Sequence, residues 1–154
     1  MAEQKILIPY NFTISEGKAL DFAIDNFAHR KNVRITLFNA YTPFPEIDLT
    51  ASPELRKIER GIAFLADEVK KKEEGLISAR RHLLQNGFSD DQVDYVFKKK
   101  EKSIAEEIVD QILKGHFRML VLSHQAGKVT RLFTRSVHDK VLSVLKDITV
   151  CIAT

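Results

Sequence analysis

The segment between residues 123 and 136 gathers the side chains best suited to hold a phosphate group. It contains three cations, Lys128, Arg131 and Arg135, together with four hydroxyl side chains. The pattern predicts that a helix begins at Ser136, and a helix start presents free N–H groups and the positive end of the helix dipole. One interpretation is a phosphate or nucleotide site. The other, favoured because serine caps are common, is a solvated segment in which Ser136 only caps its helix.

General nucleotide-binding signatures are missing from the chain. The sequence has neither G-x-x-x-x-G-K-[ST] nor G-x-G-x-x-G. Gly127 and Lys128 are followed by Val129, which lacks the hydroxyl group that would hold magnesium. A phosphate site in this segment would therefore follow another pattern.

The histidines and the cysteine give little support to catalysis or metal binding. His124 lies in the candidate segment, but a general base needs a partner that the sequence does not identify, and a loop histidine is the simpler interpretation. Ser123 precedes it directly, and adjacency does not make a catalytic pair. Cys151, the single cysteine, lies in an expected buried strand. We therefore predict no catalytic residues and no metal site.

Length and charge describe an ordinary globular protein. The chain has 154 residues, which predicts one domain over residues 1–154. Its formal net charge of +3 is too small to indicate nucleic acid. Two lysine-rich runs, at residues 70–74 and 98–102, mix both signs and favour solvated surfaces. No apolar run is long enough for a membrane helix, and the start does not resemble a secretion signal, so we expect a soluble cytoplasmic protein without membrane partners.

Hydrophobic periodicity predicts strands alternating with helices. The expected strands are residues 6–8, 33–40, 93–97, 119–122 and 148–153, and the expected helices cover about 16–28, 54–85, 103–113 and 136–145. The segment 41–53 contains three prolines and is expected to be a loop. Thr13 and Ser15 are candidate caps of the first helix. This order is typical of an α/β fold with a mainly parallel, doubly wound sheet and helices on both faces.

Ligands of such sheets bind beyond the carboxyl ends of the strands, where the strand order reverses. In this chain that edge would be formed by Pro9, Tyr10 and Asn11 after the first strand, by residues 39–41 after the second, and by Ser123 onward after the fourth. These segments contain the candidate binding residues.

Four stretches of the sequence resemble the universal stress protein family. Residues 5–20 are similar to its opening strand and helix, in which Pro-x-Asp-Phe-Ser is followed by Ala-Leu. Residues 118–124 resemble its fourth strand, and residues 136–142 resemble its Gly-Ser-Val-x-x-Lys-Val-Leu helix start. Residues 148–153 match its last strand. The resemblance covers nearly the whole chain.

The resemblance implies an adenine-nucleotide alpha-hydrolase-like sheet with strand order 3-2-1-4-5 and a homodimer built through the C-terminal strand. Many members bind ATP through G-x2-G-x9-G-[ST]. Aligning that motif on Ser136 places its glycines at Leu122, Gln125 and Arg135, so all three differ. The family's acid after the first strand is Asn11 here, and its adenine-contacting position corresponds to Ala40. The candidate cofactor-binding residues are Pro9, Tyr10, Asn11, Ala40, Ser123, His124, Gly127, Lys128, Arg135, Ser136 and Val137.

Two functions follow from this resemblance. The first is a regulatory or binding module, not an enzyme, whose ATP binding is weakened or lost because side chains replace the glycines. It would act with an unidentified protein partner and without a bound cofactor. The alternative is an ATP-binding or nucleotide-binding stress protein with a remodelled phosphate loop and slow ATP hydrolysis.

Overall fold

The computed structural model describes residues 2–10, 16–42, 55–123 and 137–154. Five strands form one sheet in the order β3-β2-β1-β4-β5. Every neighbouring pair is parallel. The strands are β1 (Gln4–Pro9), β2 (Val33–Tyr41), β3 (Val93–Lys99), β4 (Met119–Ser123) and β5 (Thr149–Ala153). The predicted parallel topology and strand order are confirmed.

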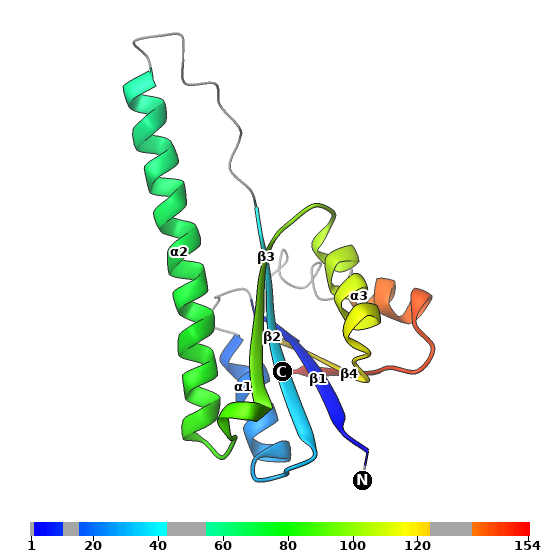
Figure 1. Ribbon diagram of the computed structural model, residues 1–154. Coiled ribbons are helices and arrows are strands. Elements are labelled where there is room, and N and C mark those ends of the chain that lie inside the picture. The colour runs from blue at the N-terminus through cyan, green and yellow to red at the C-terminus, as the bar shows by residue number, and fades with distance from the viewer. Residues whose placement is uncertain (1, 11–15, 43–54, 124–136) are drawn as a thin grey trace.

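Helices cover both faces of the sheet, as predicted. Figure 1 shows α1 (Glu16–Phe27) and α2 (Leu55–Gln85) on one face and α3 (Ile104–Gly115) on the other. Residues 137–144, which form a further helix, pack on the α3 side through Val137 and Val141. Each face therefore has its own hydrophobic core. Within β1, Ile6 and Ile8 belong to the core under α1 and α2, whereas Leu7 belongs to the core under α3.

Helix α2 is much longer than the sheet that it covers. Its C-terminal part is anchored by Leu76, Ala79 and Leu83, which are all buried. Its N-terminal half extends beyond the strands in Figure 1, and there the side chain of Phe64 is 63% exposed. The predicted stop after this helix is confirmed, because Gly87 adopts a φ of 106°, a conformation that glycine reaches without strain.

Helix α3 extends two residues beyond its predicted end at residue 113. Gly115 is the last helical residue, and His116 adopts the left-handed conformation with a φ of 54°. Position 115 requires glycine, because a Cβ atom at this position would overlap the ring of Phe117. At the N-terminus, the Ser103 side chain accepts a hydrogen bond from the N–H of Glu106, whose own side chain completes a capping box.

A buried ion pair joins α3 to the end of β3. The side chain of Glu107 is 1% exposed, and its Oε2 lies 2.7 Å from Nζ of Lys98. Its Oε1 accepts hydrogen bonds from the main-chain N–H groups of Glu101 and Lys102, at 3.3 and 3.2 Å. Burial raises the pKa of Glu107, but Lys98 and the two N–H groups outweigh that effect and hold the pKa below its ordinary value. Glu107 thus fixes the turn between β3 and α3.

We expect Glu107→Gln to lower the free energy of unfolding by about 1–3 kcal/mol at pH 7, because Lys98 loses its buried partner. The folded-state pKa of Glu107 is depressed, so its carboxylate stabilises the fold above the ordinary pKa of 4.5. That stabilisation is lost as pH falls through the lower folded value. Urea unfolding should therefore show the two proteins converging in acid. Glu101→Gln, at an exposed position, is the control; an equal loss in both variants would contradict the role of Glu107.

Candidate functional site

The carboxyl edge of the sheet brings several predicted site residues together. Pro9 is the last residue of β1, and the N–H of Tyr10 donates to the carbonyl of Phe38 on β2 at 2.8 Å. Ala40 lies near the end of β2, and Ser123 is the last residue of β4. Since β1 lies between β2 and β4, these ends form one continuous edge.

Tyr10 is held in place by Asn39, which the sequence had placed in the edge segment at residues 39–41 without assigning it a role. Asn39 on β2 is 6% exposed, and its Nδ2 donates to the main-chain oxygen of Tyr10 at 2.7 Å. This bond fixes the direction in which the chain leaves β1, immediately before Asn11. A buried amide in a strand next to an apolar run is the signal that could have identified it, because buried polar groups need partners.

Ser123 has a structural contact at the same edge. Its Oγ accepts a hydrogen bond from the N–H of Ala19, in the first turns of α1, at 3.1 Å. The bond ties the end of β4 to the beginning of α1, whose N-terminal N–H groups have no acceptors within the helix. Ser123 is thus an anchor of the helix that follows β1.

Val137 is buried, and Ala40 is half-buried against the same core. Val137 is 1% exposed and belongs to the core under α3. Ala40 packs against that same core. Leu122, at the first predicted glycine position, is also buried there and pairs in register with Ile152 of β5. The methyl and isobutyl groups at these positions fill core volume.

The remaining predicted residues lie outside the residues that the structure describes. They are Asn11, His124, Gly127, Lys128, Arg135 and Ser136, together with Gln125 and the candidate caps Thr13 and Ser15. Their proposed roles stay predictions from the sequence.

An aromatic pair lies at the same edge of the sheet, where β2 and β3 end. Strand β2 continues one residue beyond the predicted end, to Tyr41, and its ring lies 4.6 Å from that of Phe97 on β3. The carbonyl of Tyr41 accepts from the N–H of Lys100 at 2.8 Å. These contacts extend the ordered edge to β3, which the sequence had predicted to end at Phe97 but which reaches Lys99.

Titratable groups in the ordered ranges do not assemble a metal site. Among the described residues, no group of three or more histidine, cysteine, aspartate or glutamate side chains could hold an ion. Burial raises the pKa of the Cys151 thiol, which disfavours the reactive thiolate. In the same ranges, no helix is long and apolar enough to cross a membrane.

The sheet order, the helices on both faces and the edge at β1, β2 and β4 define a doubly wound α/β protein of the adenine-nucleotide alpha-hydrolase-like type. Residues 3–147 match the Universal stress protein family. The chain therefore belongs to the universal stress protein family, as its sequence motifs predicted. No curated protein shows significant sequence similarity to it.

Solved structures of family members share the fold at low sequence identity. Universal stress protein UspA from Lactobacillus plantarum is 13% identical, with a TM-score of 0.68 over 100% of this chain and 99% of that one. The Archaeoglobus fulgidus protein in complex with dAMP is 14% identical, with a TM-score of 0.67 over 100% of both chains. An Arabidopsis thaliana family protein with AMP bound is 13% identical, with a TM-score of 0.52 over 98% of this chain and 92% of that one.

Replacing Asn39 by Asp should remove the donor that Tyr10 needs. A buried carboxylate facing the carbonyl oxygen would lower the free energy of unfolding by about 2–4 kcal/mol at pH 7. The loss should shrink as pH falls, because a protonated Asp can again donate a hydrogen bond. Thermal unfolding at several pH values measures this effect. Asn32→Asp, just before β2, is the control, and a pH-independent loss at Asn39 would contradict the assigned bond.

Proposed function

We propose that this protein is a regulatory or binding module of the universal stress protein family whose ATP binding is weakened or lost. The observation that carries the proposal is the simultaneous replacement of three motif glycines by Leu122, Gln125 and Arg135. Glycine at such positions lets main-chain N–H groups approach phosphate oxygens without a Cβ atom in the way. Side chains there would occupy the space of the phosphates.

Leu122 is buried in the core, so the steric argument rests on Gln125 and Arg135. The side chain of Leu122 is 3% exposed and packs with the apolar residues under α3, so returning it to glycine would leave a cavity. The position thus serves packing in this chain. Asn11, in place of the acid that meets the nucleoside in the family, keeps a hydrogen-bond acceptor but has no charge.

A second candidate function is that of a nucleotide-binding stress protein with a remodelled phosphate loop. This candidate includes slow ATP hydrolysis. Two solved neighbours contain dAMP or AMP, and this chain has Lys128 and Arg135 in the corresponding segment. An arginine can hold a phosphate through two parallel hydrogen bonds. Nucleotide that co-purifies with the protein, detected by mass spectrometry, would favour this candidate.

The proposal includes a homodimer formed through β5 and a cytoplasmic location. β5 is at one edge of the sheet, and its Ile152 is 42% exposed. An exposed apolar edge strand favours pairing with another chain unless it is covered. The protein partner of the module is not identified by its residues.

Titration calorimetry with ATP and magnesium should give no low-micromolar dissociation constant. The expected result is heat near the level of dilution, because the three motif glycines are replaced and the side chains of Gln125 and Arg135 would obstruct the phosphates. A low-micromolar constant would refute the non-binding proposal and favour the second candidate.

Arg135→Gly separates the steric from the attractive effect of this residue. If the side chain obstructs the phosphates, affinity for ATP should rise, by about tenfold for each 1.4 kcal/mol of relieved conflict. Arg131→Gly removes the same charge from the same segment at a position outside the motif and should leave affinity unchanged. A fall in affinity for Arg135→Gly alone would identify Arg135 as a phosphate ligand.

Light scattering at micromolar concentration should report a dimer. Ile152→Lys should convert it to a monomer, because a charge on the edge strand opposes strand pairing. Phe64→Lys places the same charge at an exposed apolar residue on α2 and should leave the dimer intact. A wild-type monomer, or dissociation by Phe64→Lys instead, would overturn the proposed interface.

A further inference from the structure

A second candidate site lies at the opposite end of the sheet from the nucleotide edge. A cavity of about 330 Å³ opens between the end of α3, the segment that follows the helix at residues 137–144, and the beginnings of β4 and β5. Cavities that hold small molecules span about 300–1,000 Å³, so this volume suits a small ligand and not a nucleotide. None of its lining residues belongs to the predicted nucleotide site.

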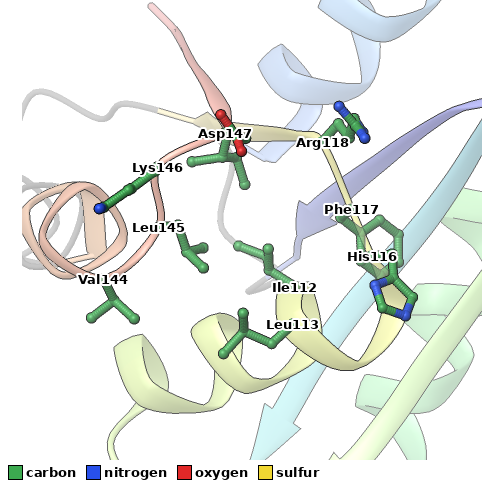
Figure 2. Close-up of a pocket in the computed structure, with 10 residues that line it drawn as sticks. Ile112, Leu113, His116, Phe117, Arg118, Val144, Leu145, Lys146 and Asp147 are labelled. Carbon is green, nitrogen blue, oxygen red and sulfur yellow. The ribbon is translucent and has the colours of Figure 1, made fainter.

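The walls of the cavity are apolar. Figure 2 shows the side chains of Ile112 and Leu145 pointing toward one another across it. Leu113 and Val144 continue the same two walls and are 52% and 48% exposed, so the apolar surface reaches solvent. An aliphatic group placed between the helices would remove this surface from water.

Two opposite charges border one end of this apolar space. Arg118 and Asp147 both line the cavity and lie above Ile112 in Figure 2. Neither side chain makes a hydrogen bond or an ion pair with any group in the described ranges, and they do not pair with each other. The site therefore offers one donor group for an anion and one acceptor group for a cation beside an apolar wall.

Other charged groups near the cavity do not change this balance. Lys146 extends away from the cavity in Figure 2, and His116 lies at its far border. At the C-terminal end of α3, the ammonium group of Lys5 donates a hydrogen bond to the carbonyl of Gly115 and lies 5.1 Å from the centre of the Phe117 ring, so the negative end of this helix already has a cationic partner.

We propose that this cavity binds a free apolar α-amino acid. The aliphatic side chain lies between Ile112 and Leu145. The α-carboxylate pairs with Arg118, and the α-ammonium group pairs with Asp147. Ligands with a single charge satisfy only one of the two side chains, and small polar amino acids leave the apolar walls in contact with water. This assignment is independent of the proposed function, because it uses no residue of the nucleotide edge.

The first test compares four small molecules by chemical-shift changes in amide NMR spectra of the full chain. L-Leucine should bind most tightly. Isocaproate lacks its ammonium group, isoamylamine lacks its carboxylate and glycine lacks its side chain, so each should bind at least about tenfold more weakly. Shifts should concentrate at residues 112–118 and 144–148. Equal binding of leucine and isocaproate, or of leucine and isoamylamine, would overturn the proposal, as would no saturable leucine binding.

The second test replaces the two charged residues, Arg118 and Asp147, one at a time. Arg118→Gln should lower the affinity for leucine and for isocaproate by about tenfold, because a charge-assisted pair with the carboxylate is lost. The affinity for isoamylamine, which has no carboxylate, should not change. Asp147→Asn should lower the affinity for leucine and for isoamylamine and leave the affinity for isocaproate unchanged. Lys146→Gln removes a neighbouring charge that points away and is the matched control. Unchanged melting temperatures verify folding, and equal effects of all three substitutions on leucine would indicate general electrostatics and contradict the assigned pairs.

Discussion

The central strand β1 has no exposed face, and both hydrophobic cores depend on it. Ile6, Leu7 and Ile8 are fully buried and point alternately into the core under α1 and α2 and the core under α3. A strand buried on both faces must be covered by helices on both sides, which requires crossover connections and parallel neighbours. The same burial fixes register, because a shift by one residue would exchange the two sets of side chains. The order of the sheet and its carboxyl edge follow from this constraint.

Polar contacts at that edge position the segments between the strands and the helices. Asn39 fixes the main chain after β1, and Ser123 joins β4 to α1. Glu107 performs the same task between β3 and α3 through a main-chain contact and Lys98. In each case a buried or half-buried side chain makes a hydrogen bond with a main-chain group that has no hydrogen-bond partner within a strand or helix. The edge is therefore rigid at its described positions whether or not a nucleotide binds, and a regulatory module could use it as a fixed surface.

Periodicity predicted the fold because strand and helix burial repeat along the chain. The run at residues 6–8 and the regular spacing in α2 and α3 were sufficient for the type of each element, their sequence along the chain and the parallel direction of the strands, whereas the strand order 3-2-1-4-5 came from the resemblance to the family. The end of α3 was not predictable in this way, since the conformations of Gly115 and His116 depend on where the Phe117 ring packs. For the candidate site, the sequence indicated Tyr10, Ser123 and the segment at residues 39–41, but not the hydrogen bond that Asn39 makes to Tyr10. The role of Asn39 depends on a contact between two strands, which spacing along one strand does not encode.

The differences from the family's glycine motif also concern packing. Leu122 and Ile112 belong to the same core under α3, and Ile112 also lines the cavity at the other end of β4. Both ends of a parallel sheet are available for binding, because each collects the ends of several elements. A family fold can therefore present chemically distinct groups, here Arg118 and Asp147, at its amino edge as well as at its carboxyl edge.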